Sequence, residues 1–136
     1  MLTVPTLRTM SAQSALAALL WSSTDTVDGE QVPLDRFDPS SSLVDRISEE
    51  WEMFKDALIS LGFEPEDERL EMIDLAEGDY WDYVAHDWIL TRNRHGAGFW
   101  DGGWSDDWVS RLCAMCDDMG EIEIYYNSED GLVYAD

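Results

Sequence analysis

Basic residues are scarce in this sequence. Eight Lys and Arg stand against 30 Asp and Glu, only one of the eight is a lysine, and the formal net charge is −22. Because phosphates repel carboxylates, we do not expect the chain to bind nucleic acid or an anionic membrane directly. The expected partners are cations, basic protein surfaces or proteins that normally hold nucleic acid. The alternative is a domain whose acidity serves only solubility.

Long apolar runs are also missing. The longest, ALAALLW at residues 15–21, has seven residues, whereas a membrane-spanning helix needs about 20. No small-residue cleavage site follows this run, so we expect neither a signal peptide nor a membrane span.

Cysteine is limited to Cys113 and Cys116, which form a C-x-x-C pair. A zinc site would need a second pair of ligands at similar spacing, and a thioredoxin-like site would need a surrounding βαβ pattern. Neither accompanies the pair. On a helix both cysteines share the apolar face with Leu112 and Met115, so we expect buried free thiols in a reducing cytoplasm, with no metal and no cofactor.

The composition nevertheless favours a folded chain, because 45% of the residues are hydrophobic and 12% are aromatic. We expect one α+β domain over residues 1–136, with a helical portion at about 6–85 and a strand–loop–helix–hairpin portion at about 86–135. In this fold the N-terminal helices pack on a small antiparallel sheet of about three strands, with one further helix.

Turn signals and periodicity predict the individual elements. We expect helices at 6–21 (capped by Thr6 or Thr9), 43–61 (between Ser42 and Gly62), 65–77 and 106–119 after Ser105, and one or two helical turns that begin at Asp79. We expect strands at 86–91, 121–126 and 132–135, and an irregular surface loop at 22–42 that wraps against the body through Val32, Leu34 and Phe37.

The helix at 43–61 carries the clearest pattern. Its predicted core stripe is Ile47, Trp51, Phe54, Leu58 and Leu61. Four acids recur on the opposite side at spacings of 4, 3 and 4 over about 16 Å; we call Asp45, Glu49, Glu52 and Asp56 the carboxylate row. The row is either a solvated helix face or a surface for a basic partner. The further acids that could extend such a surface are Glu64, Glu66, Asp67, Glu68 and Glu71.

The stretch 86–104, HDWILTRNRHGAGFWDGGW, holds both histidines and four of the nine glycines. An enzyme could use these polar residues for hydrolysis or nucleotide chemistry, with histidine as acid or base and arginine as phosphate ligand. The candidates are His86, Arg92, Asn93, His95 and Asp101. However, Asp106 and Asp107 follow where a helix N-terminus would meet a phosphate, which counts against nucleotide binding. The alternative is a joint that fixes the fold.

The same stretch resembles the signature HDFWLTRNGHGAGFWD of a family of small acidic bacteriophage proteins. The matching positions are 86–87, 90–93 and 95–101, with an aromatic residue kept at Trp88, and the departures are Ile89 and Arg94. ALLWSSTD at 18–25 and DGLVY at 130–134 resemble that family too. The resemblance implies a phage or prophage origin and action in the host cytoplasm.

Charge and resemblance together lead to a hypothesis. We expect a non-enzymatic inhibitor that imitates the phosphate array of DNA and binds a basic nucleic-acid-handling host protein, such as a CRISPR effector, a restriction enzyme or a repair enzyme. The alternatives are the small hydrolase or nucleotide-processing enzyme described above, and an acidic structural or assembly protein.

Overall fold

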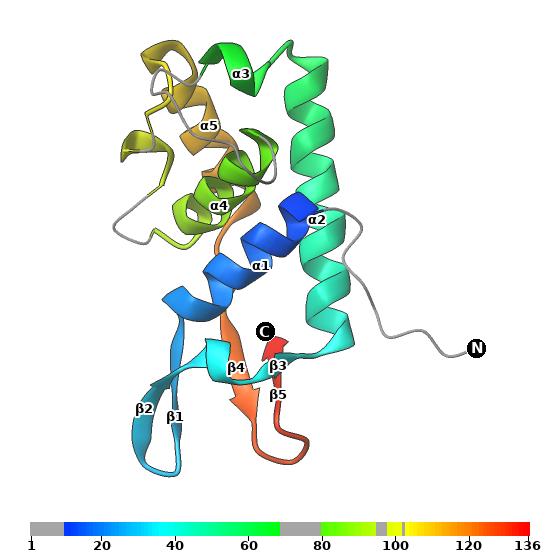
Figure 1. Ribbon diagram of the computed structural model, residues 1–136, viewed down its shortest axis with the longest axis vertical. Coiled ribbons are helices and arrows are strands. Elements are labelled where there is room, and N and C mark those ends of the chain that lie inside the picture. The colour runs from blue at the N-terminus through cyan, green and yellow to red at the C-terminus, as the bar shows by residue number, and fades with distance from the viewer. Residues whose placement is uncertain (1–9, 69–79, 95–97, 102) are drawn as a thin grey trace, which may run out of the picture.

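The computed structural model describes residues 10–68, 80–94, 98–101 and 103–136. Its helices are α1 (Met10–Ser22), α2 (Ser41–Ser60), α3 (Pro65–Glu68), α4 (Tyr80–Arg92) and α5 (Asp106–Met119), with short 3-10 turns η1 (Leu34–Arg36) and η2 (Phe99–Asp101). Its strands are β1 (Thr24–Val27), β2 (Glu30–Pro33), β3 (Asp38–Pro39), β4 (Ile124–Asn127) and β5 (Leu132–Ala135). The helices gather at one end of the molecule and the strands at the other (Figure 1).

The long helix α2 begins two residues earlier than predicted. Its N-cap is Ser40, not Ser42: the Ser40 hydroxyl accepts a hydrogen bond from the Leu43 amide at 3.1 Å. The Ser40 amide also donates to the Val133 carbonyl at 2.8 Å, which fixes the start of α2 to the sheet. Gly62 ends the helix with a φ of 86°, as expected. Leu61 was wrongly placed in the core stripe and is exposed, because it lies in this C-terminal turn.

The strand predicted at 86–91 is wrong, because these residues belong to α4. Val84, Ala85, Trp88, Ile89 and Leu90 are all buried. A helix buried on nearly every side has no polar face, and a short apolar run then cannot be distinguished from a strand by its periodicity. Because α4 begins at Tyr80, it also includes the short helical segment that was expected to start at Asp79.

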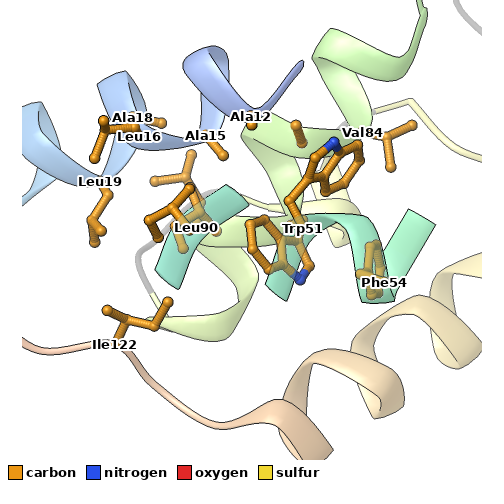
Figure 2. Packing of buried hydrophobic residues seen from close by; sticks show 14 of the residues in the cluster. Ala12, Ala15, Leu16, Ala18, Leu19, Trp51, Phe54, Val84, Leu90 and Ile122 are labelled. Atoms are coloured by element: carbon orange, nitrogen blue, oxygen red, sulfur yellow. The ribbon is translucent and has the colours of Figure 1, made fainter. Parts of the chain in front are cut away.

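Small residues on α1 allow it to pack closely against α4. Ala12, Ala15 and Ala18 of α1 are fully buried, and α1 crosses α4 (Figures 1 and 2). The expected inward positions of Leu16, Leu19 and Leu20 are confirmed. The proposed caps Thr6 and Thr9 lie outside the described residues, as do residues 69–77 of the third predicted helix.

The expected irregular loop at 22–42 contains a β-hairpin. β1 and β2 pair antiparallel around Asp28 and Gly29, which have φ values of 53° and 83°. An Asp-Gly pair with positive φ at both residues suits the tight turn of a two-residue hairpin. The segment also wraps the core as predicted, because Val32 and Leu34 are buried and Phe37 packs against the same cluster.

The three-stranded sheet has the order β3-β5-β4. The predicted hairpin of β4 and β5 is confirmed, with Tyr126 opposite Val133. The third strand is not 86–91 but β3, which pairs parallel to β5 through Asp38 and Pro39, so the sheet is mixed. The fold is therefore α+β as predicted, with a three-stranded sheet that is mixed rather than antiparallel and a second sheet of two strands.

Aromatic rings join the helices into one core. Trp51 and Phe54 of α2 contact Trp88 of α4 at centroid distances of 5.4 and 5.8 Å. Phe99 of η2 lies 6.2 Å from Phe54, and Phe63 lies 4.9 Å from the Trp108 ring of α5. Because aromatic pairs add about 0.5–1.5 kcal/mol beyond their buried area, this cluster fixes the helices relative to one another.

Candidate functional site

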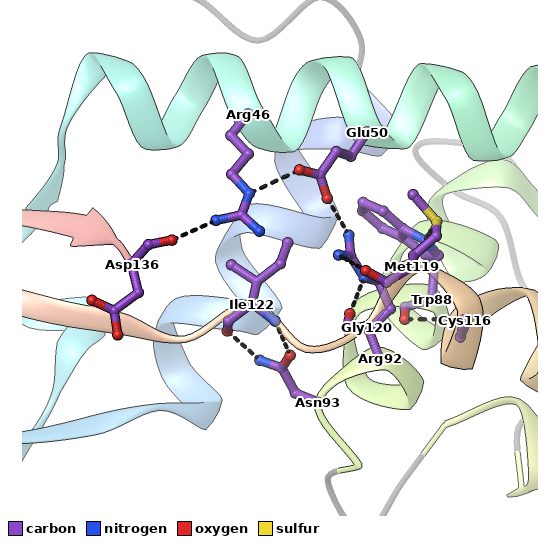
Figure 3. A network of polar contacts seen from close by, with 10 residues as sticks. All are labelled: Arg46, Glu50, Trp88, Arg92, Asn93, Cys116, Met119, Gly120, Ile122 and Asp136. Atoms are coloured by element: carbon purple, nitrogen blue, oxygen red, sulfur yellow. Dashed lines mark hydrogen bonds and ion pairs between the residues drawn. The ribbon is translucent and has the colours of Figure 1, made fainter.

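Arg92, a candidate of the enzyme hypothesis, is buried at the junction of three helices (Figure 3). Its guanidinium donates to Glu50 Oε1 at 2.7 Å, to the Gly120 carbonyl at 2.7 Å and to the Met119 carbonyl at 3.2 Å. It also lies over the Trp88 ring, 5.2 Å from its centroid. Arg92 therefore ties α4 to α2 and to the C-terminal carbonyls of α5, and its own side chain is almost fully buried.

Electrostatics support the same conclusion for Glu50. Partial burial raises the pKa of this carboxyl, but hydrogen bonds and charge from Arg46 and Arg92 outweigh burial and lower the pKa below 4.5. Burial lowers the pKa of Arg92 below its usual value, and the hydrogen bond and charge of Glu50 oppose that shift. Both groups are thus charged at neutral pH, as one ion pair with a second arginine beside it.

Asn93 also serves the fold. Its side-chain amide donates to the Ile122 carbonyl at 3.0 Å, and its Oδ1 accepts from the Ile122 amide at 2.8 Å (Figure 3). This two-way contact imitates a pair of β-ladder hydrogen bonds and holds the end of α4 to the segment before β4. Sequence reasoning did not identify these partners.

Asp87 and Thr91 connect α4 to η2. The Trp104 indole donates to Asp87 Oδ2 at 2.7 Å, and the Thr91 hydroxyl donates to the Asp87 carbonyl and accepts from the Phe99 amide. Gly98 lies so close to the Thr91 hydroxyl that an added Cβ would overlap it. The expectation of a fold-fixing joint therefore has a physical basis, although the joint is helix–loop–helix.

The remaining enzyme candidates are spread over separate contacts. His86 is about two-fifths exposed, lies 3.3 Å from Asp87 Oδ1 and approaches the Trp21 ring. The Asp101 carboxylate accepts from the Gly98 amide at 2.9 Å. His95 lies outside the described residues. The polar groups of Arg92 and Asn93 form hydrogen bonds that hold neighbouring elements of the fold together. The arrangement therefore does not favour the hydrolase alternative.

The C-x-x-C pair is part of the core. Cys116 is fully buried and its thiol donates to the Trp88 carbonyl at 3.7 Å, while Cys113 is partly buried. Burial raises the pKa of both thiols, so both are protonated at neutral pH. Both cysteines are free, as expected. Within the described ranges no group of three or more His, Cys, Asp or Glu side chains is arranged to hold a metal ion.

The carboxylate row lies on the outer face of α2. Asp45, Glu49 and Asp56 are exposed and Glu52 is partly exposed. The two basic residues of the helix lie off the row. Arg46 donates to Glu50 at 2.8 Å and to the Asp136 carbonyl at 2.9 Å, and the Lys55 ammonium lies 5.2 Å from the centroid of the Trp81 ring. Neither basic residue of this helix therefore lies within the row.

The other predicted acids follow the C-terminal end of α2. Glu64 and Asp67 are exposed. Glu68 takes part in the fold, because its carboxylate and its carbonyl accept from the Ser105 hydroxyl at 2.9 Å and the Ser105 amide at 2.7 Å. Ser105 is the N-cap of α5 as predicted, but its hydroxyl makes this contact rather than a capping bond. Glu71 and the side chain of Glu66 lie outside the described residues.

Sequence reasoning missed an apolar feature beside the row. Met53 is 66% exposed, although a helical projection places it between the row and the core stripe. That projection was a usable signal, because an exposed methionine within an otherwise acidic face is unexpected.

Comparisons with protein-family models, with curated proteins and with solved structures found no match. Over the described residues, no helix combines the length and apolar character needed to cross a bilayer.

Proposed function

We propose that this chain is a phage-type accessory protein that inhibits a basic, nucleic-acid-handling host protein by occupying its nucleic-acid site. The carboxylate row carries the proposal. Its four acids face solvent along one helix, while Arg46 and Lys55 of the same helix are engaged at its sides. A partner's arginine and lysine side chains could pair with such a row as they do with phosphates.

The spacing of the carboxylates determines how closely the row resembles the phosphates of DNA. Four carboxylates over about 16 Å give one charge per roughly 5.5 Å, against about 3.4 Å per phosphate on one DNA strand. The row therefore resembles a segment of one strand at reduced density. The remaining acids, which bring the net charge to −22, add a long-range field that speeds encounter with a basic channel.

The phage-like signature at 86–101 and the charge point to the same class of target. Host defence and repair enzymes hold DNA or guide RNA in basic channels, so one acidic surface could compete in any of them. The signature itself builds the core joint, and the acidic helices supply the face. The polar contacts of Arg92 and Asn93 are consistent with this division.

Capture from host lysate, challenged with nucleic acid, tests the proposal. The immobilised chain should retain nucleic-acid-binding proteins, and added duplex DNA should release them. A polyglutamate resin of equal charge is the control for acidity alone, and it should not retain the same protein. Retention that DNA does not reverse, or that polyglutamate reproduces, would contradict the proposal.

A further inference from the structure

An open apolar groove runs beside the carboxylate row. Its volume is about 240 Å³, and it lies between α2 and α5. Its lining residues are Met53, Phe54 and Ala57 of α2, and Met115, Asp118 and Met119 of α5. Met53 and Ala57 are exposed, so the groove opens directly to solvent.

The floor of the groove is fixed by the core. Phe54 is 2% exposed and stacks with Trp88 and Phe99. The Met119 sulfur accepts from the Trp88 indole at 3.4 Å (Figure 3). The walls of the groove are less rigid than its floor, because Met53 and Met115 have flexible thioether side chains that can adapt to an inserted group. A rigid floor with adaptable walls suits recognition of an apolar side chain.

Acids flank the groove on both helices. Asp118 is exposed on α5 and lines it. On α2, Glu49 and Asp56 stand four residues before and three residues after Met53, so they are its neighbours on the helix surface. The nearest arginine on α5 is Arg111, one turn before Met115, and its guanidinium stacks 4.9 Å from the centroid of the Trp108 ring. The rim is thus mainly negative.

We propose that this groove is a docking site for a basic amphipathic helix of the partner protein. An apolar side chain of that helix enters between Met53 and Met115, and flanking lysines or arginines pair with Asp56 and Asp118. Helix-in-groove binding uses this combination of apolar anchors and charged flanks. The inference rests on the proposed function and names the element of the partner that the acidic face receives.

Other occupants fit less well. A second copy of this chain would bring another net charge of −22 against the same rim, and like charges at close range oppose association. A small-molecule ligand is disfavoured because the groove is open and smaller than the roughly 300–1,000 Å³ of typical small-molecule pockets.

Methyl NMR of the full chain, labelled at its six methionines, tests the proposal directly. The probe is a synthetic leucine–lysine peptide with leucine on one helical face, and a peptide of equal composition with scattered leucines is its control. Only the amphipathic peptide should shift the methyl signals of Met53, Met115 and Met119.

A matched pair of variants supplies the second measurement. Met53→Ser should weaken binding of the amphipathic peptide about ten-fold, because it removes most of one buried thioether contact. Ile59→Ser, at another exposed apolar residue of α2, should leave the affinity unchanged.

Three results would contradict the proposal that the groove binds a basic amphipathic helix. These are no binding of the amphipathic peptide, binding without movement of the three groove methyls, or equal effects of the two serine variants. None of them bears on whether DNA displaces a captured partner, so the proposed function stands or falls separately.

Discussion

Arg92 and Glu50 form the central ion pair of the fold, with Nη1 of Arg92 2.7 Å from Oε1 of Glu50 although 42 residues separate them. Arg92→Met would leave Glu50 and two backbone carbonyls without this donor. We expect it to lower the free energy of unfolding by about 3–5 kcal/mol in urea denaturation, as for other broken buried pairs. Arg111→Met, at an exposed arginine stacked on Trp108, should cost at most about 1 kcal/mol. Equal losses would show that Arg92 does not hold the helices together.

The pH dependence of stability follows from the lowered pKa of Glu50. A carboxyl with a lower pKa in the folded state stabilises the fold above its unfolded pKa, near 4.5, and this contribution disappears as pH falls through the folded pKa. The stability difference between the wild type and Glu50→Gln should therefore be large at pH 7 and shrink below about pH 4.5. Urea denaturation of both proteins across this range measures it. A difference that grows with acidification would contradict the assignment, and Glu129→Gln, at an exposed acid, is the control.

Trp104 and Trp100 provide a comparison between a buried and a half-exposed tryptophan within the stretch 86–104. Trp104→Phe keeps the aromatic packing but removes the donor to the buried Asp87 carboxylate, so we expect a loss of about 1–3 kcal/mol. Trp100 is 47% exposed, and Trp100→Phe should change stability by less than about 0.5 kcal/mol. Thermal or urea unfolding distinguishes the two. A loss in Trp104→Phe no larger than that in Trp100→Phe would contradict a stabilising role for the Trp104–Asp87 hydrogen bond.

Arg94 has a φ of 52°, a left-handed conformation that favours glycine. Arg94→Gly should therefore stabilise the protein by roughly 1 kcal/mol, while Arg94→Ala, which keeps the Cβ, should not. The urea-denaturation midpoints of the two variants, each compared with that of the wild type, test this prediction. If alanine stabilises as much as glycine, the gain comes from removing the arginine side chain, not from the backbone.

Amphipathic elements could be predicted from the sequence, and buried ones could not. α2 and α5 each have one apolar and one polar side, so their existence and near-correct bounds followed from periodicity. α4 is buried around most of its circumference, and its apolar run was therefore misread as a strand. The β1–β2 hairpin had a local signal in Asp28 and Gly29, but the density of turn residues around it suggested a loop. β3 has only two residues and depends on pairing with β5, which no local pattern specifies.

The same distinction applies to the candidate site. The carboxylate row was readable because its spacing follows the helix repeat. The partners of Arg92 and Asn93 were not readable, because they lie 27–42 residues away and include backbone carbonyls that carry no sequence signal. The groove needed the placement of α5 beside α2, which depends on the aromatic core.

Charge reversal at two places on the surface tests the central claim, that the carboxylate row is a binding face and not merely a source of charge. One variant changes Asp45, Glu49, Glu52 and Asp56 to lysine. The other changes four acids at the strand end of the molecule, Glu30, Asp35, Glu123 and Glu129, all of which are exposed. Each variant moves the formal net charge from −22 to −14, so the two differ only in position.

The decisive measurement is the affinity of the wild type and both variants for the protein that DNA releases from the immobilised chain, at low and high salt. We expect the row variant to bind at least about 100-fold more weakly and the control variant to lose less than about ten-fold, with both effects reduced by salt. Equal losses in the two variants, or an affinity insensitive to salt, would contradict the role of the row.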